Sequence, residues 1–415
     1  MRSLQKIAWT VCIICSIFLL AAVAVAADIQ YRYDPANTGN YTPVAGASGT
    51  SVSKLWDFTT GNDVDSCPAV TDGLVYVGSD DDNIYALNAA TGAKIWNFTT
   101  GGNVYDSPAV VNGKVYAGSL DGTVYALWAA TGAPIWTFPT GDEIYGSPTV
   151  ANGVVYIGSR DDKVYALNAN TGAKIWDYTA AGSVSSCPAV AGGIVYIGSY
   201  DYNITALHAS NGTKLWNYKT GFDVRSPVAF ADDVVYAGSM DNYVYALYAP
   251  TGAKIWSFET GGEVYTGPAV VDGVVYAGSM DNKVYALNAN TGAKIWEFST
   301  GGDVRSSPAV ANGVVYLGSY DNRLYALNAS TGAELWNYTT GYNILSSPSI
   351  VDGVVYVGSQ DNKVYALATH GKTVGMGVYR QSANQFILRP ADYPSSPSVR
   401  IGWGKYSSDL PVTGD

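Results

Sequence analysis

The chain has 415 residues, of which 47% are hydrophobic and 14% charged, with 46 glycines, 33 tyrosines and 11 tryptophans. This composition excludes an intrinsically disordered chain, because it supplies enough apolar side chains for a large packed core. The net charge is −11, with 34 acidic and 23 basic residues, so no basic surface is available for phosphate backbones and we expect no nucleic-acid partner.

The first residues have the pattern of an export signal. Arg2 and Lys6 are basic, residues 8–26 are apolar, and the small residues 24–26 suit cleavage before Ala27. The sequence therefore predicts a signal peptide over residues 1–26, a lead-in segment over 27–51, and a secreted or cell-surface protein. The apolar run is also nearly long enough to span a bilayer, so an uncleaved anchor is the alternative. Nothing later in the chain could span a membrane once the signal is removed.

Asn-x-Ser/Thr triplets agree with export, because they are acceptors for N-linked glycans in secreted chains. A sequence rich in Asn and Thr also makes such triplets by chance, so unused triplets are the alternative. The candidate glycosylation sites are Asn40, Asn97, Asn203, Asn211, Asn328 and Asn337.

The rest of the chain is dominated by an internal repeat of forty residues. One stretch, VYALNANTGAKIW, occurs twice without change, at 164–176 and 284–296. Such a period, with short apolar runs and regular turn signals, is typical of a β-propeller in which each copy is one four-stranded blade. A solenoid of stacked hairpins is the alternative. Eight tryptophans mark the period: Trp56, Trp96, Trp136, Trp176, Trp216, Trp256, Trp296 and Trp336.

Turn chemistry divides each copy into four strands. The first turn reads Asn-Gly or Asp-Gly in most copies, the second Gly-Ser-x-Asp, and the third Thr-Gly, as at Thr171-Gly172. The strands between them are apolar at nearly every position, because a blade packs on its neighbours through both faces. We expect the second-turn aspartates to cap their own turns rather than form a metal ring. These are Asp81, Asp121, Asp161, Asp201, Asp241, Asp281, Asp321 and Asp361.

The two ends of the repeat predict how the ring closes. The eighth copy loses its pattern after VYALATHGKT and never supplies a tryptophan strand, whereas the stretch SKLWDFTT, which contains Trp56, precedes the first copy and has no blade of its own. Placing this stretch as the outer strand of the eighth blade removes both defects and leaves no open sheet edge.

Of the four cysteines, Cys67 and Cys187 lie outside the signal, at equivalent places in the first and fourth copies. Three blade steps separate them, roughly 20 Å, whereas a disulfide needs Cα atoms within about 7 Å. We therefore expect two unbridged thiols.

The recurring pattern Ala166-x-Asn168-x-x-Thr171-Gly172-x-x-x-Trp176 resembles the tryptophan-docking motif of the pyrroloquinoline-quinone-repeat (PQQ-like) propellers. The lead-in YRYDPANTGNYTP is also similar to the segment that precedes them. The resemblance covers roughly residues 30–370 and implies that each Trp packs between neighbouring blades. The third motif position, usually acidic in that family, is mostly Asn here.

The same resemblance raises the question of an enzyme, because quinoprotein dehydrogenases of this fold oxidise alcohols or sugars with a bound quinone and Ca²⁺. Such a site needs a general-base Asp, Ca²⁺ ligands, an Arg and commonly an adjacent cysteine pair. The sequence assembles none of these and contains no Cys-Cys. With two histidines, His208 and His370, neither a His-based metal site nor a Ser-His-Asp triad is credible. We expect no catalytic residues, no metal and no cofactor.

Differences between the copies indicate a recognition surface. In a meander, the connection into the first strand and the second turn emerge on one face of the ring, and both carry variable residues. Tyr and Arg recur there, and these side chains anchor interfaces. Neutral drift at exposed turns is the alternative. The candidate binding face consists of Asp65, Tyr105, Tyr145, Arg160, Tyr200, Arg225, Tyr265, Arg305, Tyr320 and Leu345.

After the repeat, residues 371–415 look like one unit of the Gly-Val-Phe/Tyr-Arg…Asp-Leu-Pro-Val-x-Gly-Asp repeats of secreted prokaryotic surface proteins. We predict an all-β chain, with an eight-bladed propeller of four-stranded antiparallel blades over 52–370 and a short β-type extension over 371–415, which could be a truncated repeat domain.

The predicted function is a monomeric, non-catalytic module that binds protein or carbohydrate at the cell envelope. The alternatives are a quinoprotein dehydrogenase and an assembly factor of the outer-membrane barrel-assembly type. Against the assembly factor stands the absence of a lipobox, because no Leu-x-x-Cys precedes the expected mature amino terminus.

Overall fold

The computed structural model describes residues 34, 37–39, 41 and 49–370. In the tail it describes the backbone of β33 (Val378–Arg380), β34 (Gln385–Leu388) and β35 (Val399–Gly402), which pair in that order as an antiparallel sheet. The predicted signal peptide lies outside the described residues. Within the described part of the chain, no helix has the length and hydrophobicity to cross a membrane.

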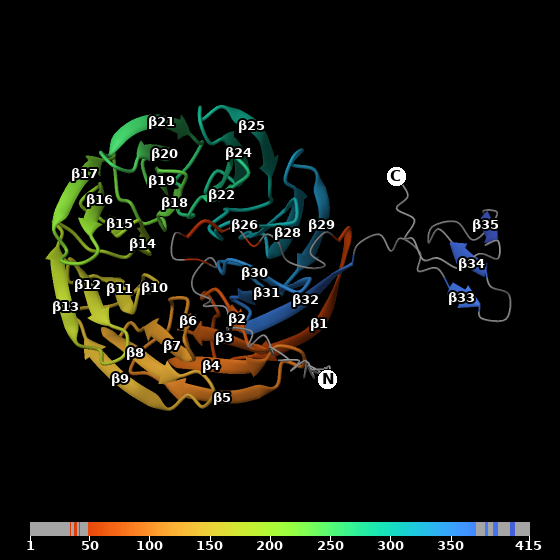
Figure 1. Cartoon of the computed structure of the whole chain (residues 1–415), viewed down its shortest axis with the longest axis horizontal. Coiled ribbons are helices and arrows are strands. Elements are labelled where there is room, and N and C mark those ends of the chain that lie inside the picture. The colour runs from red at the N-terminus through yellow and green to blue at the C-terminus, as the bar shows by residue number, and fades with distance from the viewer. Residues whose placement is uncertain are drawn as a thin grey trace, which may run out of the picture.

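The repeat forms a closed ring of eight four-stranded antiparallel blades, which confirms the predicted propeller (Figure 1). The short first strand of each blade lies nearest the centre and the fourth lies at the periphery. The two middle strands are buried at nearly every position, as in β11, where only Val154 is partly exposed. Their apolar runs therefore reflect packing on a neighbouring blade through each face.

The strands of the blades follow the repeat closely. Blade 1 has β2 (Ala69–Thr71), β3 (Leu74–Ser79), β4 (Asn83–Asn88) and β5 (Lys94–Thr99), and blade 2 has β6 (Ala109–Val111), β7 (Lys114–Gly118), β8 (Thr123–Trp128) and β9 (Pro134–Pro139). Blade 3 has β10 (Thr149–Ala151), β11 (Val154–Ser159), β12 (Lys163–Asn168) and β13 (Lys174–Thr179), and blade 4 has β14 (Ala189–Ala191), β15 (Ile194–Gly198), β16 (Asn203–His208) and β17 (Lys214–Lys219). Blade 5 has β18 (Ala229–Ala231), β19 (Val234–Gly238), β20 (Tyr243–Tyr248) and β21 (Ala253–Glu259), and blade 6 has β22 (Ala269–Val271), β23 (Val274–Ser279), β24 (Lys283–Asn288) and β25 (Lys294–Ser299). Blade 7 has β26 (Ala309–Ala311), β27 (Val314–Gly318), β28 (Arg323–Asn328) and β29 (Glu334–Thr339), and blade 8 has β30 (Ser349–Val351), β31 (Val354–Ser359), β32 (Lys363–His370) and β1 (Ser51–Thr59).

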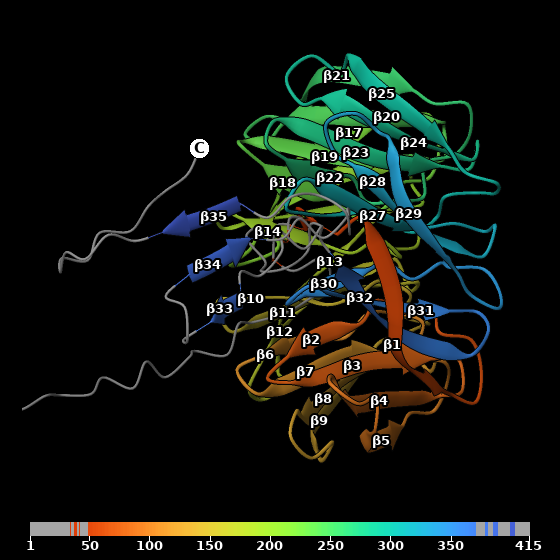
Figure 2. The same cartoon turned by 90° about the vertical axis from the view of Figure 1, so that its right-hand side faces the viewer.

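Blade 8 is completed by the amino-terminal strand β1. It pairs antiparallel with β32 from Ser51 opposite His370 to Thr59 opposite Lys363, so residues some three hundred positions apart share one sheet. Seen from the side, β1 runs beside both β32 and the outer strand β29 of blade 7 (Figure 2). The predicted closure is confirmed, and β32 is left without an open edge.

The tryptophans dock each blade on the next, as the family resemblance implied. The Trp56 indole N–H donates to the Ala89 carbonyl at 2.8 Å, and its ring covers Gly92. A Cβ built on Gly92 would lie 2.7 Å from the indole, and the residue has φ +71°, so both the close approach and the backbone conformation require glycine. The same hydrogen bond, at 2.8 to 3.1 Å, is made by Trp96, Trp136, Trp176, Trp216, Trp256 and Trp296.

Trp336 is the exception. Its ring is buried like the others, yet its indole nitrogen has no hydrogen-bond partner among the described residues. Its neighbour is blade 8, where β32 runs on to His370 and no Thr-Gly turn follows before the outer strand, because that strand comes from the other end of the chain. Closing the ring with β1 therefore leaves the Trp336 indole without the hydrogen bond that the other seven docking tryptophans make.

Seven of the eight second-turn aspartates cap their turns, as predicted, and all eight also join neighbouring blades; the exception to the capping is Asp361, whose Oδ1 has no partner among the described residues. Asp121 accepts the amide of Thr123 through Oδ1 at 2.8 Å. Its Oδ2 accepts the amide of Gly101, in the preceding blade's final loop, at 2.8 Å and the Tyr125 hydroxyl at 2.6 Å. Each turn therefore holds one blade to the next at the ring's edge.

Residues 37–39 and Tyr41 of the lead-in segment lie against the inner strands and form a plug. Asn37 is fully buried and donates to the carbonyls of Pro188 and Val228, in blades 4 and 5, at 2.8 and 3.1 Å. The backbone of the plug bonds Val270 and Val310 in blades 6 and 7, and the Tyr41 hydroxyl lies 3.3 Å from Ser349 Oγ in blade 8. The lead-in segment thus ties five blades together across the centre.

Candidate functional site

The ring has two faces, and hydrogen bonds define them. Val64 donates to the carbonyl of Ser359 and Asp80 donates to that of Asp63, so the loops into the first strands meet the second turns on one face, here called the cavity face. Ala89 donates to Gly73, so the first and third turns meet on the other, here called the hairpin face. This confirms the expected placement of both variable positions on one face.

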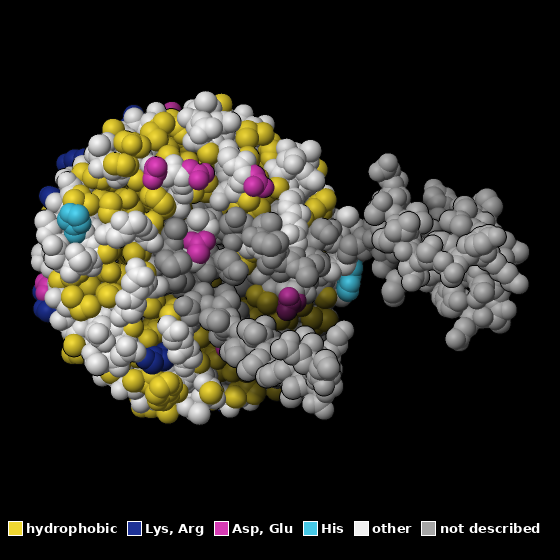
Figure 3. All heavy atoms as spheres, in the orientation of Figure 1, with side chains coloured by type: hydrophobic (Ala, Val, Ile, Leu, Met, Phe, Trp, Pro, Cys, Tyr) yellow, Lys and Arg dark blue, Asp and Glu magenta, His cyan; other side chains and the backbone are white. Residues whose placement is uncertain are grey.

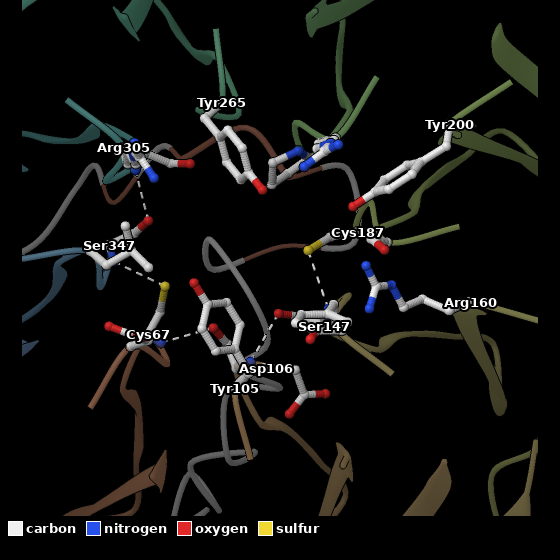
Figure 4. A pocket seen from close by; sticks show the side chains of 18 residues that line it. Cys67, Tyr105, Asp106, Ser147, Arg160, Cys187, Tyr200, Tyr265, Arg305 and Ser347 are labelled. Atoms are coloured by element: carbon white, nitrogen blue, oxygen red, sulfur yellow. Dashed lines mark hydrogen bonds between the residues drawn. The ribbon is translucent and has the colours of Figure 1, made fainter. Parts of the chain in front are cut away.

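A central cavity of about 320 Å³ lies among the loops that enter the first strands (Figure 4). Side chains from different blades point into it, among them Tyr105, Tyr200, Tyr265, Arg160 and Arg305. Nine of the ten predicted binding-face residues line this cavity, and the tenth, Tyr320, lies next to it under Arg305. That these side chains bind a ligand stays a prediction.

Three arginines at the cavity are held in place by an aromatic ring and a carboxylate. The carbon atom of each guanidinium lies 4.3 to 4.7 Å from the centre of a tyrosine ring, and a guanidinium nitrogen lies 2.7 to 3.1 Å from a carboxylate oxygen. Stacking and ion pairing together fix the planar groups before any ligand arrives. The three sets are Arg160 with Tyr145 and Glu143, Arg225 with Tyr200 and Asp223, and Arg305 with Tyr320 and Asp303.

Blades 1 and 2 make the cavity acidic on one side. Asp65 is 8% exposed, and burial together with the charge of Asp80 raises the pKa of its carboxyl to about 7. Burial raises the pKa of Asp80 to about 6. Oδ2 of Asp65 accepts the Gln360 amide at 3.3 Å, while Oδ1 has no partner among the described residues. The cavity therefore offers acceptors on one side and guanidinium donors on the other.

Asp106 is a cavity residue that sequence reasoning missed. It is 2% exposed, its Oδ2 accepts the Gly118 amide at 2.7 Å, and its buried Oδ1 has no partner among the described residues. Burial raises its pKa well above the usual range. A signal was present, because the equivalent position in most other copies is Ser or Thr, whose hydroxyl bonds the same glycine, as Ser66 does with Gly78.

The charge state of Asp65 predicts a pH-dependent stability. Because its pKa is higher in the folded than in the unfolded chain, the contribution of Asp65 favours the fold fully below pH 4 and is lost as pH rises through about 7. We expect Asp65→Asn to be more stable than the wild type by about 2 kcal/mol at pH 8 and equal to it near pH 4. Urea unfolding at the two pH values measures this. A variant destabilised equally at both would contradict it.

The two cysteines lie in the cavity wall as thiols and do not form a disulfide, as predicted. They belong to a girdle in which the backbone amide of one blade donates to the side chain at the same position in the next. Ser347 donates to Cys67 Sγ at 3.0 Å and Ser147 to Cys187 Sγ at 3.2 Å. Burial raises the pKa of the Cys187 thiol to about 12, so it packs as a neutral group. At Pro227 the girdle is interrupted, because proline has no N–H and no side-chain acceptor.

The candidate glycosylation sites lie away from the cavity. Asn97, Asn211 and Asn337 are exposed, whereas Asn203 and Asn328 are half-buried and hydrogen-bonded. Asn40 lies outside the described residues. On the face of the ring seen in Figure 3, charged groups among the described side chains are few and scattered. The cavity is where charged and aromatic groups of different blades converge.

The sequence matches two family models. Residues 153–376, over half of the chain, match the β-propeller of the beta-alanine-activating enzyme, and residues 44–145 match the outer membrane protein assembly factor BamB. No curated protein matches the chain.

Solved structures share its fold at low identity. BamB from Moraxella catarrhalis is 19% identical with a TM-score of 0.68, over 77% of this chain and 100% of that one. The quinohemoprotein alcohol dehydrogenase from Comamonas testosteroni is 17% identical with a TM-score of 0.74, over 85% and 83%. The computationally designed Ika8 protein is 19% identical with a TM-score of 0.69, over 75% and 98%. An assembly factor, an enzyme and a design share this architecture, so the fold alone does not decide the function.

Proposed function

Because the chain belongs to the PQQ-like β-propeller family, we propose that it is a non-catalytic binding module of the cell surface or envelope that takes a polar ligand into the central cavity. The observation that carries this proposal is the pairing of three preorganised guanidiniums with two buried carboxylates, Asp65 and Asp106, around one cavity. Fixed polar groups on an aromatic wall are what a small-molecule site needs.

A carbohydrate fits this cavity best. Sugar hydroxyls donate and accept at once, so they match a wall with acceptors at Asp65 and Asp106 and donors at Arg305 and Tyr105. Arg305 bonds Asp303 through Nη2 at 3.1 Å, so other N–H groups of its guanidinium remain for the ligand. Tyrosine faces also pack well on the C–H surface of a sugar ring.

The geometry of the chain ends favours display at a surface. Ser51 pairs with His370, and Thr369 donates to Gly353 of the first turn, so β1 begins and β32 ends on the hairpin face. The plug lies across the centre, with contacts to residues further along the first strands than those that line the cavity. A domain that follows His370 would therefore leave the cavity face open to a ligand.

A quinone cofactor with Ca²⁺ does not fit these residues. Pyrroloquinoline quinone is a polycarboxylate that needs uncompensated positive charge, whereas each of the three cavity arginines is already neutralised by a carboxylate of the chain. Among the described residues, no group of three or more His, Cys, Asp or Glu side chains is placed to hold a metal ion. We therefore derive no reaction through this cofactor.

A protein partner is the second candidate, favoured by the likeness to BamB, an outer membrane protein assembly factor by name. Tyrosine and arginine, which dominate the cavity wall, are also the side chains that anchor protein interfaces. In that case a side chain or chain end of the partner would enter the cavity.

Binding at the cavity is tested with the mature chain on a glycan array and in a pull-down from envelope extract. We expect Arg305→Gln to weaken ligand capture at least about tenfold, because it removes a preorganised donor. Arg323→Gln is the matched control, since Arg323 is exposed on β28 and does not line the cavity. Equal loss in both variants, or alcohol oxidation with added quinone and Ca²⁺, would overturn the proposal.

A further inference from the structure

A second cavity lies at the rim of the ring, where blade 4 departs from the repeat. In the other seven blades a tyrosine in the third strand donates its hydroxyl to Oδ2 of the second-turn aspartate at 2.5 to 2.7 Å. Its ring packs on a Phe or Tyr from the outer strand of the preceding blade, with centres 5.3 to 5.9 Å apart. These tyrosines are Tyr85, Tyr125, Tyr165, Tyr245, Tyr285, Tyr325 and Tyr365.

Blade 4 has Thr205 in this place, and both partners of the missing ring remain. Tyr178, from the outer strand β13 of blade 3, and Asp201, in the second turn, line a cavity of about 310 Å³ together with Asn203, Lys214 and Thr205. Oδ2 of Asp201 accepts the Ala181 amide at 3.1 Å. In the other seven blades the same oxygen also accepts a phenol hydroxyl, and here that position opens into the cavity.

We propose that this cavity is a binding site for a small phenol, a ligand unrelated to that of the central cavity. The ligand hydroxyl donates to Asp201 Oδ2 and its ring packs on Tyr178, as the chain's own tyrosines do seven times. A hydrogen bond to an ionised acceptor gives the hydroxyl its selectivity. Seven filled copies in one chain provide the template for the pose.

The template also limits the shape of the ligand. In the other blades the tyrosine ring is attached through its para carbon to a Cβ, and in blade 4 Thr205 supplies that Cβ with its own methyl and hydroxyl. The space next to the para carbon is therefore occupied. A free phenol without a large para substituent fits, whereas a tyrosine side chain of another protein does not.

The test is a titration of the mature chain with phenol, followed by NMR. We expect binding at one site per chain with a dissociation constant on the order of 1 mM, usual for so small a ligand, and shifts at Ala181 and Thr205. Benzene, which lacks the hydroxyl, should bind at least about fivefold more weakly. N-acetyl-tyrosinamide should not compete, and competition by it would overturn the assignment to a free phenol.

Two variants complete the test. Thr205→Tyr restores the repeat and should abolish phenol binding, while ligand capture at the central cavity stays unchanged. Tyr125→Thr opens the equivalent space in blade 2 and should raise the stoichiometry to about two phenols per chain. Absence of phenol binding to the wild type, or binding that survives Thr205→Tyr, would overturn the proposal and leave the proposed function of the central cavity untouched.

Discussion

Replacing Trp56 by Ala is expected to lower the free energy of unfolding by about 3–5 kcal/mol. The indole is 8% exposed, packs with its ring centre 6.0 Å from that of Tyr356, and donates to Ala89 in blade 1. The change removes this buried ring and its hydrogen bond, and leaves the Ala89 carbonyl with the longer bond from the Tyr356 hydroxyl, at 3.3 Å. The loss arises at the junction between blades 8 and 1, where the ring closes.

Denaturant unfolding of the wild type, Trp56→Ala and Trp176→Ala measures this. Trp176 docks blade 3 on blade 4 in the same way, so the two variants should lose similar stability. As a finer control, Trp56→Phe should cost about 1 kcal/mol more than Trp336→Phe, because the Trp336 indole N–H makes no hydrogen bond among the described residues. A Trp56→Ala variant as stable as the wild type would rule out closure through β1.

Removing the residues before Thr60 is expected to have a larger effect than any single substitution. The truncation takes away β1 and exposes β32 as a free edge beside the outer strand of blade 7. An unpaired edge strand invites pairing with another chain, so we expect aggregation and loss of a single cooperative unfolding transition.

The matched control is a truncation before Gly49, which removes the plug but keeps β1. It loses the plug and the plug's contacts with five blades, yet leaves every blade with four strands. We expect this protein to stay monomeric and cooperative, with stability reduced by a few kcal/mol, on the order of the hydrogen bonds lost. Size-exclusion chromatography and unfolding curves separate the two outcomes. If both truncations behave alike, β1 does not act as the closing strand.

The sequence predicted the blades because their determinants are local. Asn-Gly and Thr-Gly turns set the hairpins, and the spacing of forty places each tryptophan one blade apart. Closure was also predictable, since the stretch around Trp56 and the incomplete eighth copy match each other. The unbridged state of Cys67 and Cys187 followed from blade counting alone.

The candidate site was only partly predictable. The variable residues around Tyr105 and Arg305 could be assigned to one face from the order of strands. Their convergence on one cavity depends on the radius of the ring and on side-chain direction, which no local pattern encodes. Asp106 was missed because it looks like one more variation at a Ser position, and its burial comes from neighbouring blades.

What the sequence by itself determined is the repeating unit, the number of blades and the way the ends meet, because turn chemistry and strand pairing act between residues of one copy or of adjoining copies. The tertiary structure alone decided what lies at the centre and at the rim. Asn37 enters the ring because carbonyls of two blades face it at once, Asp65 has a raised pKa because other blades bury it, and Thr205 leaves a cavity because Tyr178 comes from the blade before. Each of these depends on groups from separate blades meeting in space, and that meeting exists only once the ring is closed.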